Sequence, residues 1–457
     1  MSENLDLGKL SMPKLIRKMS VPAAVGFLVM NIYFIADSIF IGKYVGSIGI
    51  AAISVVMPIT FLISSIGMAI GVGGSSMISR FLGANESKKA NRTFGNMISL
   101  TIILSIIIMS VAYLFMDEVL ITFGAQGDIL PKAKEYFSTL ILAIPMLAWS
   151  MMSNNSMRAE GQPKKAMMIM TISALVNLVM DPIFIIGLDM GMKGAAIATA
   201  LGYLSSTLYS LWFYLRGEGK LQMSLEFLAL QASYIKEIFS IGFVTLARQG
   251  TLSLLSIVLN HSLFRFGGET AVAAYGIISR TMMFTNFPVL GITQGFLPIA
   301  GFNYGARHYD RVKSSIKLSI RYATLIASSI FVFVLLFPEQ ITSIFVSKEE
   351  VDILSLTPKA MILVFLATPL ISTQLIGSAY FQAIGKAIPA LLLTLSKQGF
   401  FLIPFLLILP KFFDLNGIWY AFPVSDILAT IVTYLFLKRE MKKNLNAKIE
   451  KSSVELT

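Results

Sequence analysis

The stretch PAAVGFLVMNIYFIADSIFI, residues 22–41, carries a single charged residue, Asp37. A run of about 20 apolar residues is long enough to cross the hydrocarbon core of a bilayer as an α-helix. A carboxylate within such a run costs roughly 2.5 to 3.5 kcal/mol unless it is protonated, paired or hydrated. A second run, AMMIMTISALVNLVMDPIFIIGL at residues 166–188, holds Asp181 in the same way. Both runs predict membrane helices, and both acids are candidates for a functional role.

The composition of the whole chain indicates an all-α polytopic membrane protein. The 457 residues are 55% hydrophobic and 14% charged, whereas soluble domains carry about 25% charged residues. There is no cysteine and there are only two histidines, so disulfides and cysteine metal sites are excluded. No constellation of catalytic groups stands out. We therefore expect no enzyme activity and no cofactor.

Twelve spans are expected, and the loops between them alternate in charge. One side of the membrane receives 26 Lys and Arg residues and the opposite side receives 8. By the positive-inside rule, both termini face the cytoplasm of a multi-pass protein in the cell (plasma) membrane. This placement of charge explains the net charge of +12 without a nucleic-acid partner. The spans cover residues 20–43, 50–79, 94–116, 136–157, 166–187, 194–215, 240–264, 271–302, 318–337, 361–383, 387–410 and 417–437.

An internal repeat relates the two halves of the chain at an offset of about 222 residues. Ala143-Ile144-Pro145 matches Ala367-Thr368-Pro369, and Asp181-Pro182 aligns with Ile403-Pro404. Each half has six spans, so the repeats are parallel, which is one of the known transporter plans. We therefore expect a cytoplasmic N-terminus at 1–13, an N-lobe at 14–215, an inter-lobe linker at 216–238, a C-lobe at 239–437 and a basic cytoplasmic tail at 438–457.

An oxygen-rich spot is expected around Asp181. Asn177 lies four residues earlier and so shares its helix face, while Pro182 frees a backbone carbonyl one turn earlier. Thr199 in the sixth span can add a hydroxyl. Such a set holds either a proton or a small cation such as Na⁺. The alternative is a hydrogen-bond network that only holds helices together.

Asp37 is expected to load and release protons, because burial in an apolar cavity disfavours its charged form. Tyr33 shares its helix face, and Pro22 supplies a possible hinge in the first span. Met30, Tyr33 and Met151 are candidate cavity residues, because methionine and aromatic side chains adapt to varied ligands. The alternative for Asp37 is a permanent pair with Arg248 or Arg280.

Further charged residues lie in spans of the second half. Arg248, Lys397 and Asp426 either line a water-filled cavity or form structural ion pairs, and Arg248 is also a candidate for the cavity wall. Asp37 and Asp181 have no acidic counterpart at the aligned positions of the second half. We therefore expect the coupling chemistry to lie in the N-lobe.

The order of spans, the parallel repeat, Asp37 and the Asn177-x-x-x-Asp181-Pro182 motif resemble the multidrug and toxic compound extrusion (MATE) family, over residues 14–440. The resemblance implies two six-helix lobes around a V-shaped central cavity, in a protein that we expect to be a monomer. It implies export of amphiphilic, mostly cationic compounds in exchange for H⁺ or Na⁺. It also implies a cation site at Asp37, Asn177, Asp181 and Thr199, with Na⁺ possible at the last three, and a cavity wall at Tyr33 and Asn154.

Alternating access by rocking of the lobes is the expected mechanism, with loading of the acids reshaping the first span near Pro22. The alternative is a flippase for a lipid-linked saccharide, which needs a basic cavity for a pyrophosphate. Arg248, Arg280 and Lys397 keep this alternative open. An integral membrane enzyme and a passive channel have no supporting motif.

Overall fold

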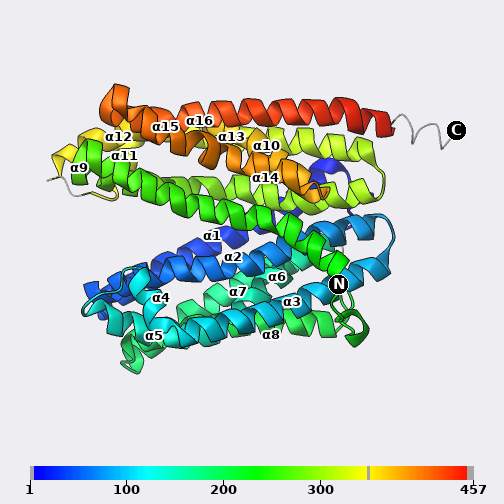
Figure 1. Cartoon of the computed structure of the whole chain (residues 1–457), viewed down its shortest axis with the longest axis horizontal. Helices are drawn as coiled ribbons and strands as arrows, with labels where there is room; N and C mark the ends of the chain where they lie inside the picture. The colour runs from blue at the N-terminus through cyan, green and yellow to red at the C-terminus, as the bar shows by residue number, and fades with distance from the viewer. Residues whose placement is uncertain (1–4, 347–349, 450–457) are drawn as a thin grey trace. The chain divides into compact units, whose positions relative to one another are not determined.

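The protein consists of long helices in a computed structural model that describes residues 5–346 and 350–449 (Figure 1). Every regular element in these two ranges is a helix. Residues 1–4, part of the predicted N-terminal segment, and residues 450–457, part of the predicted basic tail, lie outside the described residues. The first half contains α1 (Met12–Tyr44), α2 (Ser47–Gly83), α3 (Ser87–Leu114), α4 (Met116–Thr122), α5 (Ile129–Leu142), α6 (Ile144–Ala159), α7 (Pro163–Pro182) with the π-helix η1 (Ile183–Gly187), and α8 (Gly191–Leu215).

The second half follows a linker that contains only the short 3₁₀ helix η2 (Leu225–Phe227). Helix α9 begins at Ala232, inside the predicted linker at 216–238. The elements of this half are α9 (Ala232–Gly305), α10 (Tyr309–Leu336), α11 (Pro338–Ser343), α12 (Val351–Phe365), α13 (Thr368–Ala383), α14 (Ala387–Leu395), η3 (Ser396–Leu402), α15 (Ile403–Ile408), α16 (Pro410–Glu440) and η4 (Met441–Leu445).

Twelve spans result when bends and breaks are taken into account. Eight helical stretches in the described ranges are long and apolar enough to cross a membrane, and two bent pairs, α5 with α6 (55°) and α12 with α13 (45°), raise the number to ten. Helix α9 contains two spans, because Gly268 interrupts it with φ 61° and ψ −158°, a conformation that only glycine adopts readily. Helix α8 adds the last span: it has 25 residues, and its Ser, Thr and Tyr side chains lower its mean hydropathy.

The repeat is visible in the backbone itself. Helix α3 begins at Ser87 and α10 begins 222 residues later, at Tyr309. Left-handed backbone conformations recur at matching places, and both repeats place a π-helix, η1 or η3, next to the aligned Asp181-Pro182 and Ile403-Pro404 pairs. The matching left-handed positions are Gly46 and Gly268, Asn85 and Arg307, Gly161 and Gly385, and Asp189 and Asp414. Side-chain chemistry differs at most of these places, so the shared backbone is the stronger sign of duplication.

The chain forms two compact units. The first comprises residues 1–7 and 25–246, and the second comprises residues 8–24 and 247–457. Helix α1 therefore contributes its first part to the second unit and its remainder to the first. The linker and the start of α9 belong to the first unit. Each unit has its own apolar core, built around Phe137 and Tyr136 in the first and around Trp419 and Phe422 in the second.

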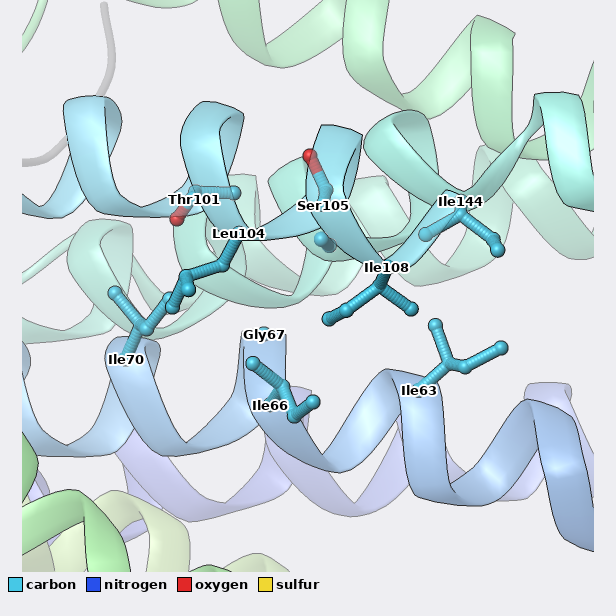
Figure 2. A pocket seen from close by; sticks show the side chains of 10 residues that line it. Ile63, Ile66, Gly67, Ile70, Thr101, Leu104, Ser105, Ile108 and Ile144 are labelled. Atoms are coloured by element: carbon cyan, nitrogen blue, oxygen red, sulfur yellow. The ribbon is translucent and has the colours of Figure 1, made fainter. Parts of the chain in front are cut away.

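Small residues allow close helix packing inside the first unit. A Cβ atom on Gly67 would lie 2.8 Å from the Cα atom of Ala148 in α6, and one on Gly73 would lie 2.1 Å from the carbonyl oxygen of Ile238 in α9. Contacts of this kind let membrane helices approach through their backbones. A cavity between α2, α3 and α6 has a volume of only about 10 Å³, and Ile63, Ile108 and Ile144 close one end of it (Figure 2). It has room for about one water molecule, so it does not bind a drug-sized molecule.

Candidate functional site

Two buried carboxyl groups form the centre of the candidate site in the first unit. Asp37, in the second half of α1, is 5% exposed, and Asp181, in the last turn of α7, is fully buried. The two carboxyl groups lie within hydrogen-bonding reach of each other. Neither forms an ion pair with a basic side chain in the ranges that the structure describes. Two carboxylates in contact cannot both ionise readily, so the pair must hold at least one proton or another cation.

Asn177 links the acids to a hydroxyl on the neighbouring helix. Its Nδ2 atom donates to Thr199 Oγ1 at 3.1 Å and, more weakly, to Asp181 Oδ1 at 3.5 Å. Among the residues that the structure describes, three buried oxygens of this cluster find no hydrogen-bond partner, namely Asp37 Oδ1, Asn177 Oδ1 and Asp181 Oδ2. Unsatisfied buried acceptors are costly, so the cluster is suited to receive protons or a cation.

A group of tyrosines encloses the acids. Tyr33 on α1 and Tyr136 on α5 each interact with the hydroxyl of Thr199, and Tyr203 on α8 interacts with Tyr33. All three rings are at least 92% buried. Tyr33 is predicted from the sequence, whereas Tyr136 and Tyr203 are not. Tyr203 lies four residues after Thr199, and that spacing is a signal that was available. No local pattern indicates Tyr136, which reaches the site only through tertiary packing.

The local sequence explains why Asp181 lies where α7 changes its geometry. Pro182 has no backbone N–H to donate to the preceding turn, and the helix continues as the π-helix η1 from Ile183 to Gly187. π-Helical segments often occur at functional sites. The hydrogen-bond ladder is thus altered directly beside the carboxyl group.

The other predicted site residues lie elsewhere or have other partners. Asn154 donates from Nδ2 to the carbonyl oxygen of Ala166 at 2.6 Å, a bond that holds α6 against α7. Met151 packs on the core of the first unit, and Met30 is half-buried. Arg248 belongs to the second unit, as does Pro22 in the first part of α1. The structure therefore brings together Asp37, Asn177, Asp181, Thr199 and Tyr33, but it does not join Asn154 to them.

The charged residues of the second unit fall into two groups. Lys397, on the π-helix η3, places Nζ 2.6 Å from Asp426 Oδ1 on α16, and both side chains are largely buried. Arg280 is exposed, and Arg248 is half-buried. The Lys397–Asp426 pair supports the structural interpretation for these two residues. No cluster of three or more His, Cys, Asp or Glu side chains able to hold a metal ion occurs in the described parts of the chain.

Comparison with known proteins identifies the family. The profile of the family MatE matches the chain twice, at residues 22–183 and 246–408. The chain belongs to the MatE family. The two matches correspond to the two repeats, one in each half, and the resemblance predicted from the sequence is confirmed.

Individual MatE proteins are similar along almost the whole chain. The multidrug export protein MepA of Staphylococcus aureus (strain MSSA476) is 26% identical over 418 residues, which are 92% of each protein. A crystal structure of MATE in the bent conformation superposes with a TM-score of 0.92 at 25% identity, covering 99% of this chain and all of the other. An outward-facing multidrug resistance MATE family transporter of the MOP superfamily gives 0.91 at 25% identity, covering 98% and 99%.

These relatives establish the architecture of this MatE protein. It is a multi-pass membrane protein with twelve membrane helices in two parallel six-helix repeats, as predicted. Its relatives are transporters and multidrug exporters rather than enzymes. A transporter of this family acts on small-molecule substrates.

Proposed function

We propose that this MatE protein exports amphiphilic, mostly cationic compounds in exchange for H⁺ or Na⁺, with Asp37 and Asp181 as the coupling groups. The observation that carries the proposal is the pair of buried carboxyl groups in contact, with no basic side chain of residues 5–346 and 350–449 paired to either. Such a pair changes its charge only by taking up or releasing a cation from outside the protein. A group with that property couples cation movement to a conformational change.

The exchange follows from competition for negative charge. When the pair loses its cation, a negative charge remains on a carboxylate in a low-dielectric environment. Binding of another cation beside that charge is then strongly favourable. A cationic substrate and the coupling cation both satisfy this charge, but together they over-compensate it. Loading of the acids therefore favours release of the substrate, and unloading favours its binding.

Protons fit the arrangement without any rearrangement. The Asn177 amide directs its donor group at Thr199 and Asp181, so those two oxygens already act as acceptors. A Na⁺ ion at Asn177, Asp181 and Thr199 needs the amide to rotate so that its carbonyl oxygen faces the ion. The donor set consists entirely of oxygen atoms and suits Na⁺ after that rotation, but H⁺ is the simpler coupling ion.

Helix α1 offers a path from the acids to the second unit. Asp37 lies in the part of α1 that belongs to the first unit, and Pro22 lies in the part that belongs to the second. The helix is continuous from Met12 to Tyr44. A change of charge at Asp37 therefore acts on an element shared by both units, with Pro22 as the point where the helix lacks a backbone hydrogen bond. Alternating access by movement of this helix is the mechanism we propose.

The flippase alternative loses much of its support. Of the three basic residues that support it, Lys397 is neutralised by Asp426. The names of the relatives, a multidrug export protein and a multidrug resistance transporter, favour drug export. We propose that both termini face the cytoplasm and that the transporter is a monomer in the cell membrane.

The proposal is tested by uptake of a fluorescent cationic dye into proteoliposomes under an imposed pH gradient, without sodium. The wild-type protein should accumulate dye against its gradient, and Asp37→Asn and Asp181→Asn should not. Asp128→Asn, which removes an exposed carboxylate outside the site, should retain uptake. If both site variants transport at the wild-type rate with the same dependence on the gradient, the coupling role is wrong. Uptake restored only by a sodium gradient would assign Na⁺ as the coupling ion, and no uptake under either gradient would favour the flippase.

A further inference from the structure

A groove with a volume of about 530 Å³ lies in the second unit between α10 and the end of α16. Helix α13 packs against both of these helices and contributes Thr373 to the lining. The elements appear side by side among the C-terminal helices of Figure 1. The groove is remote in sequence from the acid pair, and the two belong to different units.

Four lysines surround the groove: Lys313 and Lys317 on α10, Lys438 near the end of α16, and Lys442 on η4. None of the four forms an ion pair with a carboxylate within residues 5–346 and 350–449. Lys313 donates to Asn446 Oδ1 at 3.0 Å, a neutral acceptor that leaves its charge uncompensated.

The lysines repel one another along each helix. Lys313 and Lys317 are four residues apart in α10, and like charges at this spacing destabilise a helix. Lys438 and Lys442 are likewise one turn apart at the end of α16. Within the described residues no carboxylate pairs with these lysines, so an anion bound between the two helices would relieve the repulsion.

The lining between the lysines is apolar. Ile316 and Leu437 are buried, while Ile320 and Met441 are half-buried and contribute to the open face of the groove. Tyr434 adds an exposed aromatic ring one turn before Lys438, whose Nζ lies 5.9 Å from the centre of that ring. A small soluble anion has no apolar part that could pack against such a surface. The combination suits an amphiphile with a negative head and hydrocarbon chains.

We propose that the groove binds an anionic phospholipid, with its phosphate among the four lysines and its acyl chains along the apolar residues of α10 and α16. The charge distribution of the loops puts this end of α16 on the cytoplasmic side, where basic pockets between membrane helices meet anionic head groups. The groove is separate from the coupling acids. In this proposal it binds a lipid and not the exported compound.

Native mass spectrometry of the delipidated full-length protein tests the proposal. Phosphatidylglycerol and phosphatidylcholine with identical acyl chains are titrated in neutral detergent, and bound lipid is counted. The wild-type protein should bind phosphatidylglycerol more tightly, and Lys317→Gln/Lys442→Gln should weaken that binding on the order of tenfold. The charge-matched control Lys88→Gln/Lys236→Gln, with two exposed lysines of the first unit, should bind as the wild type does.

Three results would overturn the proposal. The first is equal binding of the two lipids, and the second is an equal loss in the groove variant and the control. The third is binding of glycerophosphoglycerol, which has no acyl chains, as tightly as the intact lipid, because that would make the groove a site for a soluble anion. Lys317→Arg/Lys442→Arg retains both charges and should retain lipid binding, which separates loss of the site from misfolding.

Discussion

Replacing Glu160 with glutamine is expected to remove a pH dependence of stability that its buried carboxyl group creates. Glu160 lies in the turn after α6 and is fully buried. Its Oε2 atom accepts hydrogen bonds from the backbone N–H groups of Lys220 at 2.7 Å and Leu221 at 3.1 Å, which fixes the linker between the repeats to the first unit. Desolvation by burial nevertheless raises the pKa of Glu160 from 4.5 to about 7, although these bonds and the charge of Lys220 act in the opposite direction.

The sign of the effect follows from the raised pKa. The folded protein binds the proton of Glu160 more tightly than the unfolded chain does, so protonation favours the fold. This contribution is fully present below about pH 4.5, is lost as the pH rises to about 7, and then stays constant. A difference of this size corresponds to about 3 kcal/mol in the free energy of unfolding.

Equilibrium unfolding in detergent micelles between about pH 4 and pH 8 provides the assay. The stability of the wild type minus that of Glu160→Gln should fall by up to about 3 kcal/mol across this range. A difference that stays constant with pH would refute the reasoning. Glu218→Gln, on the same linker, is the matched control: the hydrogen bond from Lys165 Nζ lowers the pKa of Glu218, so its contribution should be lost as the pH falls instead.

Three further perturbations test the packing and the site. Gly73→Ala should lower stability by about 1 to 3 kcal/mol, because its Cβ atom meets a backbone carbonyl oxygen of α9, whereas Gly276→Ala, with open space around it, should be neutral or stabilising in thermal unfolding. Lys397→Met should lower the free energy of unfolding by about 3 to 5 kcal/mol by leaving Asp426 buried and unpaired, and Lys397→Met/Asp426→Leu should recover most of that loss. Thr199→Val removes an acceptor of the site amide and should slow dye uptake driven by a pH gradient by roughly fivefold, equivalent to about 1 kcal/mol; an unchanged rate would exclude a role for this hydroxyl.

The fold was largely predictable, because membrane spans and an internal repeat can both be recognised from patterns in the sequence. The bends were not predicted. The sequence predicts one span at residues 136–157, yet helix α5 begins at Ile129, and the chain bends by 55° where α6 starts. Pro145 stands at the second position of α6, which is where proline starts a helix rather than continuing one. The residues of the bend were visible in the sequence, but their effect on direction depends on packing.

The site was predictable to the extent that its residues share a helix face. Asn177 and Asp181 are four residues apart, and a carboxylate in an apolar run stands out wherever it occurs. Tyr136 and the Lys397–Asp426 pair show the limit, because their contacts join helices distant in sequence, and no spacing rule predicts which helices meet. Only the family resemblance predicts Asn154 at the cavity wall. Its bond to the carbonyl of Ala166 is a contact that only the tertiary structure reveals.

The most direct test of the central claim is to count the protons released when the cationic dye binds to the purified transporter in weakly buffered, sodium-free detergent solution. If the acid pair exchanges a proton for the substrate, the wild-type protein should release about one proton per bound dye. The Asp37→Asn/Asp181→Asn variant should release none. Tight dye binding by the wild type with no release of protons, or equal release by the variant, would contradict proton exchange at this pair.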